Sequence, residues 1–251
     1  MKVYDGDINV YFEYSKNNTT IYYAINNTSN WDILGNSTIT VNNGDTIYFY
    51  GPLNNPLNDG GVTRGFHTSG TGKIDLVGNL LSLCNPNWTS AINITSSNFS
   101  SMFRECKNNL YNANNSYIRT NNIRTNIDAG YGYLFLDCNN LKTPVNWICE
   151  NNSLTVSGSI ATFIGMYVRC TSLQSVIIPP IIGRAPSRIL ERYVDGCTSL
   201  NKMYYNGTLS INYVNFSRNI PTTGDFYNLG GATYTTGTSG IPSGWTIHTS
   251  L

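Results

Sequence analysis

The chain has little charge and no long hydrophobic run. Its 251 residues include 15 basic and 14 acidic side chains, which gives a formal net charge of +1 and a charged fraction of 12%, about half of the share usual in globular proteins. Because no segment is rich in Lys and Arg, the sequence lacks the positive patch of a nucleic-acid-binding protein. Because no stretch approaches the roughly 20 apolar residues of a spanning helix, we expect no membrane span.

Signals for secretion, metal binding and catalysis are also scarce. Acidic residues interrupt the N-terminal segment, so it lacks the apolar core of a secretory signal peptide. The six cysteines form no CxxC pair and the chain has two histidines, so we expect no metal site and no cofactor. The Gly- and Asn-rich stretch 53–72 carries Asp59, Arg64 and His67, which we interpret as solvated loop residues because His67 has no positioned partner in the sequence. We therefore predict that the protein is not an enzyme.

An internal repeat is present, and four of the six cysteines mark it. Cys-to-Cys distances are 32, 32 and 27 residues, and apolar residues stand seven, four and three positions before each cysteine. This i, i+3, i+4, i+7 spacing is typical of one face of an amphipathic helix. Each cysteine then reads as a small buried hydrophobe, with a disulfide between neighbouring units as the alternative. The cysteines and the apolar residues three positions before them are Phe103 and Cys106, Phe135 and Cys138, Tyr167 and Cys170, and Val194 and Cys197.

A leucine follows each cysteine after a short polar turn, at Leu110, Leu141, Leu173 and Leu200. The last two leucines continue as L-x-x-φ-x-φ, where φ is apolar, and this alternation predicts a short strand. A unit of helix, turn and strand cannot cover its own apolar side, so we expect the units to stack. Residues that point outward from the predicted strands are candidate binding residues, namely Thr143, Ser175, Ile177, Lys202 and Tyr204.

The predicted fold class is therefore α+β, with three parts. Residues 1–83 alternate apolar and polar side chains around turn signals such as Asn43-Gly44, which predicts an N-terminal antiparallel β domain. Residues 84–220 hold the leucine-rich repeats. Residues 221–251 are rich in Gly, Thr and Pro and end in apolar residues, which predicts a C-terminal β cap over the open end of the stack.

The repeats and the two ends resemble the BspA-like leucine-rich repeat proteins, in a form encoded by gut Bacteroides and their phages. The repeat is clearest in Tyr167-Val-Arg-Cys170-Thr-Ser-Leu173 and Val194-Asp-Gly-Cys197-Thr-Ser-Leu200. The L-P-A-T-x-L sequence usual in that family is represented here by Ile178-Pro179-Pro180 alone. Similar terminal and link motifs are Trp31 with Ile39-Thr40-Val41, Gly44 to Gly51, Gly78 to Leu83, Thr223 to Tyr227, and Gly237 to Ile247.

This resemblance implies recognition and surface attachment, with no catalytic residues to carry over. We expect a non-enzymatic virion protein, such as a head fibre or a tail-associated adhesin, that is made in the host cytoplasm and reaches the virion surface without a signal peptide. Its expected partners are other virion proteins and a host-surface glycan or protein, and exposed sheet edges predict a homo-oligomer, either a dimer or a trimer. A bacterial cell-surface adhesin is the alternative, and a carbohydrate-active enzyme is the less favoured third reading.

Overall fold

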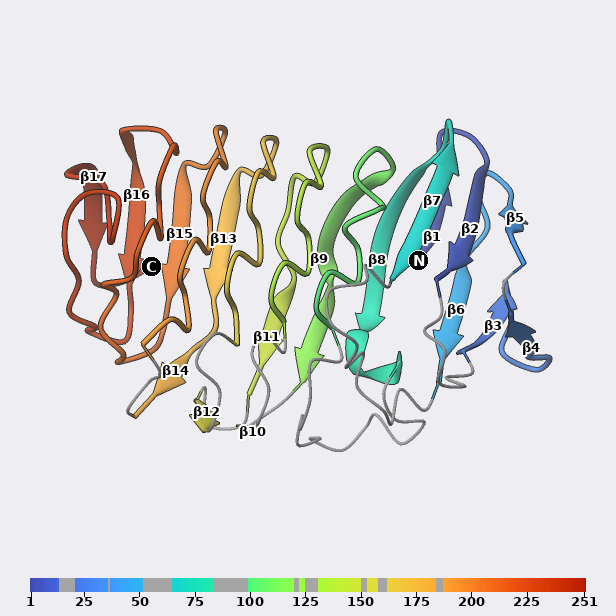
Figure 1. Ribbon diagram of the computed structural model, residues 1–251, viewed down its shortest axis with the longest axis horizontal. Helices are drawn as coiled ribbons and strands as arrows, with labels where there is room; N and C mark the ends of the chain where they lie inside the picture. The colour runs from blue at the N-terminus through green and yellow to red at the C-terminus, as the bar shows by residue number, and fades with distance from the viewer. Residues whose placement is uncertain are drawn as a thin grey trace.

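The computed structural model describes residues 1–13, 21–35, 37–51, 65–83, 99–119, 122–124, 131–149, 153–157, 162–183 and 187–251. Within these ranges the chain forms seventeen strands and one short 3-10 helix, η1, at Leu80–Leu83. Figure 1 shows the strands side by side along the long axis of the molecule, from the blue N-terminal end to the red C-terminal end. The described residues include no helix long and apolar enough to cross a membrane.

Two small antiparallel sheets form the N-terminal end, in the orders β5-β2-β7 and β4-β3-β6. Their strands alternate buried and exposed side chains, as in β2, where Ile8, Val10 and Phe12 are buried. The alternation follows from the pleat, which points successive side chains to opposite faces. The strand bounds are β2 Ile8–Phe12, β3 Ile21–Ile25, β4 Asp32–Leu34, β5 Ile39–Val41, β6 Ile47–Tyr50 and β7 Phe66–Gly70.

One sheet connects the N-terminal end to the repeats. Strand β8 (Lys73–Asn79) pairs antiparallel with β1 (Lys2–Tyr4) and parallel with β9 (Leu110–Arg119). Strand β9 in turn pairs parallel with β11 (Asn146–Ile148). The buried apolar side chains form a single cluster that runs from Met1 to Trp245. Strand pairing and core packing therefore continue across residue 83.

The remaining strands are parallel and stack coil upon coil. They form the sheets β10-β12-β14 and β13-β15-β16-β17. Parallel pairing is expected when each strand returns to the same side of the molecule after one coil of chain. The bounds are β10 Asn122–Arg124, β12 Leu154–Ser157, β13 Ser175–Ile178, β14 Ile181–Ile182, β15 Lys202–Tyr205, β16 Thr223–Asn228 and β17 Gly244–His248.

The predicted α+β fold class is wrong, because the segments expected to be helices are chains of turns. Residues 131–137, 162–169 and 187–196 are turns throughout, and no α-helix occurs in the described part of the chain. Within the described residues the chain is almost entirely β-sheet and turn, so the units are not helix–turn–strand units. The twelve repeat residues used for the prediction are nevertheless buried: Phe103, Cys106, Leu110, Phe135, Cys138, Leu141, Tyr167, Cys170, Leu173, Val194, Cys197 and Leu200.

Backbone hydrogen bonds in these turns alternate between the coil itself and the next coil. The N–H groups of Leu134 and Cys138 donate to carbonyls three residues earlier, at 3.3 and 3.0 Å. The N–H groups of Tyr133 and Phe135 donate instead to the following coil, to the carbonyls of Ile164 and Met166, each at 2.9 Å. In an α-helix all interior N–H groups would donate to carbonyls of the same segment. Here every second N–H donates to the next coil instead, so the segment bonds the coils together and is not a helix.

A left-handed backbone conformation recurs five residues and one residue before the cysteine position. Tyr133, Gly165 and Arg192 have φ values of 55°, 57° and 55° at the first place, and Arg169 and Gly196 have 57° and 80° at the second. Glycine adopts such angles without steric cost, whereas most other residues rarely do. These two left-handed places lie four residues apart. The backbone therefore repeats every four residues and buries apolar side chains at i, i+3, i+4 and i+7, which explains why the sequence resembles an amphipathic helix.

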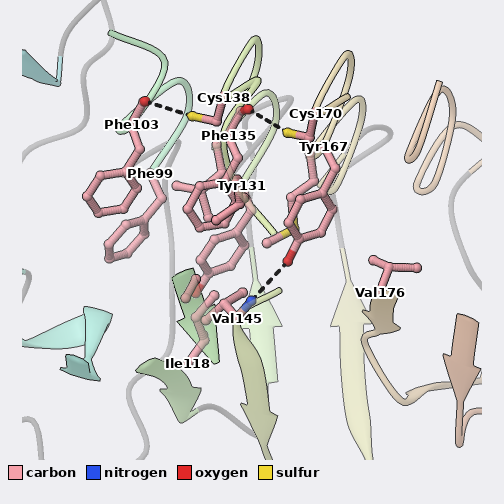
Figure 2. Close-up of a cluster of buried hydrophobic side chains, with 14 of the residues drawn as sticks. Phe99, Phe103, Ile118, Tyr131, Phe135, Cys138, Val145, Tyr167, Cys170 and Val176 are labelled. Atoms are coloured by element: carbon pink, nitrogen blue, oxygen red, sulfur yellow. Dashed lines mark hydrogen bonds between the residues drawn. The ribbon is translucent and has the colours of Figure 1, made fainter. Parts of the chain in front are cut away.

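Equivalent side chains stack from coil to coil (Figure 2). The rings of Phe103 and Phe135 lie 5.5 Å apart, and those of Phe135 and Tyr167 lie 5.3 Å apart, with interplanar angles of 11° and 14°. A second column joins Phe99, Tyr131 and Phe163 at 5.2 and 5.7 Å. These separations are close to the spacing of about 4.8 Å between neighbouring strands, so both sides of each coil advance by nearly the same distance.

The cysteine thiols form a third column, and each donates a hydrogen bond to the preceding coil. The Sγ atoms of Cys138 and Cys170 lie 3.2 and 3.0 Å from the carbonyl oxygens of Phe103 and Phe135 (Figure 2). Cys106 and Cys197 make the same contact, at 3.2 and 3.0 Å, with the carbonyls of Phe66 and Tyr167. All four are free thiols, so the alternative of disulfides between neighbouring units does not apply to them. Cys84 lies outside the described residues.

The stack continues beyond the cysteine repeats into the region predicted as a cap. Val194 donates its N–H to the carbonyl of Phe216, which places Ile220 at the position of the cysteine in a further coil. Asn215 and Asn219 have φ values of 53° and 58° at the two left-handed places. Strands β16 and β17 then extend the sheet of β13 and β15 in parallel register.

Ionisation of the buried thiols should weaken the fold in alkaline solution. Unfolded chains ionise their thiols near the ordinary pKa of about 8.5, whereas burial raises the pKa of Cys106 to about 12 and raises that of Cys170 well above its usual range. The unfolded state therefore loses protons first, and the free energy of unfolding falls as the pH rises above about 8.5, by up to ~1.4 kcal/mol per pH unit for each thiol. Urea denaturation at a series of pH values measures this slope.

Cys170→Ser provides the control, because a hydroxyl keeps the hydrogen-bond donor and does not ionise in this range. We expect the free energy of unfolding of the variant to fall less steeply with pH, because one ionising thiol no longer contributes to the slope. A free energy of unfolding that stays constant up to pH of about 10, or equal slopes in the two proteins, would contradict the buried thiol column.

Candidate binding surface

The outer face of the sheet β13-β15-β16-β17 gathers outward-pointing side chains into rows. Parallel pairing without a register shift places Ile177, Tyr204, Tyr227 and His248 opposite one another on successive strands. Side chains on one face of a sheet repeat every second residue, so a second row lies two residues earlier. We call the two rows together the outer ladder.

The first row of the outer ladder is aromatic. The rings of Tyr204 and Tyr227 are stacked at 4.7 Å with an interplanar angle of 13°, and those of Tyr227 and His248 are stacked at 4.6 Å and 16°. Ile177 extends the row by one strand. Because the rings lie face to face, the row presents ring edges and the two phenol hydroxyls to its surroundings. Such a row is rigid, since each ring limits the rotation of the next.

The second row is polar and carries one charge of each sign. It runs through Ser175, Lys202, Asp225 and Thr246. The carboxylate of Asp225 is 2.8 Å from Nε2 of His248, which ties the polar row to the aromatic row. Within these four strands Lys202 and Asp225 are the only outward residues with a permanent charge. The outer ladder is therefore close to neutral and rich in hydroxyl groups.

A hollow of about 340 Å³ lies beside the aromatic row. Ile177 and Tyr204 contribute to both the row and the hollow, and Trp147, Tyr205 and Asn206 also line the hollow. Cys149 faces the same hollow, but burial raises the pKa of its thiol to about 11. A thiol with that pKa is neutral near pH 7 and a poor nucleophile. The hollow therefore offers aromatic surface and amide groups rather than a reactive group.

Four of the five predicted binding residues lie together on the outer ladder. Ser175 is opposite Lys202, and Ile177 is opposite Tyr204. Thr143 does not lie with them, because it is outside any strand and its side chain is hydrogen-bonded to the backbone of a neighbouring strand. Its Oγ1 accepts hydrogen bonds from the backbone N–H groups of Ala113 and Asn114, at 3.0 and 3.3 Å. The strand predicted after Leu141 begins three residues later than Thr143, at Asn146.

Asp225, Tyr227, Thr246 and His248 belong to the same surface but are not among the predicted residues, because the composition of residues 221–251 predicts a separate cap. A usable signal was present in the sequence. The segment Asp225-Phe-Tyr-Asn228 has the same length and alternation as Lys202-Met-Tyr-Tyr205. The polar residue Asn228 replaces the last apolar residue of the pattern, and this replacement hides the similarity.

The other histidine has a similar environment at the opposite end of the molecule. His67 lies in β7, its ring stacks on Tyr11 at 4.4 Å, and its Nε2 is 3.0 Å from a carboxylate oxygen of Glu13. The Tyr11 hydroxyl is 2.9 Å from Nδ1 of the same ring. The prediction that His67 has no positioned partner is therefore wrong.

Asp59 and Arg64 lie outside the described residues, which contain no group of three or more His, Cys, Asp or Glu side chains able to hold a metal ion.

Comparison with known proteins gives no match. No family model matches the chain, no curated protein matches its sequence, and no solved structure matches its fold.

Proposed function

We propose that the protein is a non-enzymatic adhesion protein that contacts a glycan through the outer ladder. The observation that supports this proposal most strongly is the aromatic row Tyr204, Tyr227 and His248, with the hollow that opens beside Tyr204. Partly exposed aromatic side chains on a rigid sheet provide contact area at little cost in conformational entropy. Strand pairing holds the row in place, so ligand binding requires no rearrangement of the backbone.

The chemistry of the surface favours a sugar over a charged ligand. A sugar ring has apolar C–H groups that pack against aromatic surface, and hydroxyl groups that exchange hydrogen bonds with hydroxyls, amides and carboxylates. The hollow supplies aromatic surface from Trp147 and Tyr204 and an amide from Asn206. The polar row supplies Asp225 and Thr246. An anionic polymer such as nucleic acid would require a cluster of basic residues, and Lys202 is the only Lys or Arg on these strands.

Tyr204→Ala should weaken glycan binding without unfolding the protein. Tyr204 is half-buried at the centre of the outer ladder, and its loss removes both a ring of the row and one wall of the hollow. We expect the dissociation constant for immobilised mucin glycans to rise roughly tenfold, the scale of a single aromatic contact at an interface. Binding measured by surface plasmon resonance, with thermal unfolding of each variant, tests this expectation.

Tyr48→Ala is the matched control, because Tyr48 is an exposed strand tyrosine on a different sheet. It should leave the dissociation constant unchanged. Equal affinities for wild type and Tyr204→Ala would exclude Tyr204 from the site. Binding that persists after enzymatic removal of the glycans would assign the surface to a protein partner, and release of shortened glycans would show an enzyme.

The proposed location is the surface of a phage virion, and this part of the proposal rests on the resemblance of the repeat, link and terminal motifs to phage-encoded BspA-like proteins. Weak individual contacts suit such a location, since display in many copies raises the apparent affinity by about 10² to 10⁴. Mass spectrometry of purified particles should detect the chain as a virion component. Detection on the bacterial envelope, and not in particles, would favour the alternative of a cell-surface adhesin.

A further inference from the structure

We infer that β17 is a dimerisation edge, where a second copy of this chain pairs antiparallel with the first across a two-fold axis at Ile247. Strand β17 is the last member of the sheet β13-β15-β16-β17, and in the described residues it pairs with β16 alone. Along its other edge no described strand lies beside the backbone groups. This inference concerns assembly and does not depend on the proposed ligand.

Backbone direction identifies the groups that face the open edge. Asp225 of β16 donates its N–H to Asn201 in the previous coil at 2.9 Å. Thr246 is the residue opposite Asp225, so its N–H also points back toward the previous coil. Because successive residues of a strand alternate in direction, the N–H and C=O groups of Ile247 both point to the open edge.

The Ile247 side chain shows that the core is also uncovered at this edge. Val176, Met203 and Phe226 occupy the same inward position on the three preceding strands, and each is fully buried. Ile247, which is opposite Phe226, is 37% exposed. The difference arises because each earlier strand is covered by the next coil, whereas no described coil covers β17.

On the turn side of the same coil, backbone groups at this end of the stack have hydrogen-bond partners. The uncovered edge is therefore on the sheet side. Ser217 donates its N–H to Thr238 at 3.0 Å and its hydroxyl to the carbonyl of Gly240 at 2.6 Å. Tyr213 donates its N–H to Ser239 at 2.8 Å. The loop 237–240 therefore satisfies the turns at this end, while the sheet edge beside it has no equivalent cover.

Strand β17 also lacks the features that usually protect an edge. Its sequence is Gly-Trp-Thr-Ile-His, with no Lys, Glu, Asp, Arg or Pro. Edge strands that must stay unpaired commonly carry charges or proline. The absence of both from a strand with an exposed apolar residue indicates an edge that pairs.

A second copy fits this edge because the contact is short and self-complementary. A two-fold axis perpendicular to the sheet runs the two β17 strands antiparallel and sets Ile247 opposite Ile247 of the second copy. Each residue then donates its N–H to the carbonyl of the other, as directly opposed residues do in a hydrogen-bonded antiparallel pair. The two exposed isoleucine side chains lie on the same face and cover each other. The contact is isologous and closes at two copies.

Ile247→Lys should separate the copies without unfolding either one. Two lysines would face each other at the axis, while the monomer keeps its own hydrogen bonds because the Ile247 backbone groups do not serve β16. Sedimentation equilibrium over a range of concentrations should give twice the chain mass of 27.8 kDa for wild type. The variant should give the single-chain mass at the same concentrations, with a dissociation constant raised at least tenfold.

Val214→Lys is the matched control, because Val214 is an exposed apolar residue on the turn side of the molecule. It should remain dimeric. Circular dichroism and thermal unfolding check that both variants are folded. If Ile247→Lys does not fold, Ile247→Pro takes its place, since proline removes the open N–H and is tolerated on an edge strand.

A wild-type chain that stays monomeric at every concentration would overturn the inference. A trimer would do the same, because a two-fold contact closes at two copies. A dimer that survives the Ile247 substitution, or one that Val214→Lys separates equally well, would place the interface elsewhere.

Discussion

Backbone N–H groups that point along the long axis hold the coils of this molecule together on both of its sides. On the sheet side they belong to the parallel strands, and on the turn side they belong to alternate residues such as Tyr133 and Phe135. Neighbouring strands lie about 4.8 Å apart, whereas packed helices need roughly 8 to 10 Å. Helices on one side would force the stack to bend, whereas turns that bond from coil to coil keep both sides at nearly the same spacing, and the strands follow one another along the long axis (Figure 1).

This common spacing determines where side chains lie. Residues at equivalent positions fall into columns, so aromatic rings stack on aromatic rings, and each thiol reaches the carbonyl of the coil before it. That carbonyl already accepts the N–H of its own cysteine position, as Phe103 accepts from Cys106. A small side chain with a weak donor therefore suits the place. The same spacing builds the outer ladder, because parallel strands without register shifts align outward side chains as strictly as inward ones.

The repeat, its buried residues and half of the outer ladder could be predicted from the sequence, and the secondary structure of the repeat could not. Apolar residues at i, i+3, i+4 and i+7 indicate which side chains are buried, but a helix and a chain of four-residue turns share that pattern. The distinguishing signal is glycine at left-handed positions, as at Gly165 and Gly196. Tyr133 and Arg192 obscure it at the places equivalent to Gly165, and Arg169 obscures it at the place equivalent to Gly196. In the fifth coil Ile220 replaces the cysteine, which hides that coil in the sequence. The prediction therefore lacks Asp225 and Tyr227 of β16, and also Thr246 and His248 of β17.

Scalar coupling across hydrogen bonds, measured by NMR on isotope-labelled protein, tests the coil-to-coil ladder most directly. The amide nitrogen of Phe135 should couple to the carbonyl carbon of Met166, because its N–H donates to that carbonyl at 2.9 Å. In a helix the same amide would donate to the residue four positions earlier, Tyr131. A coupling from Phe135 to Tyr131, with none to Met166, would contradict the account.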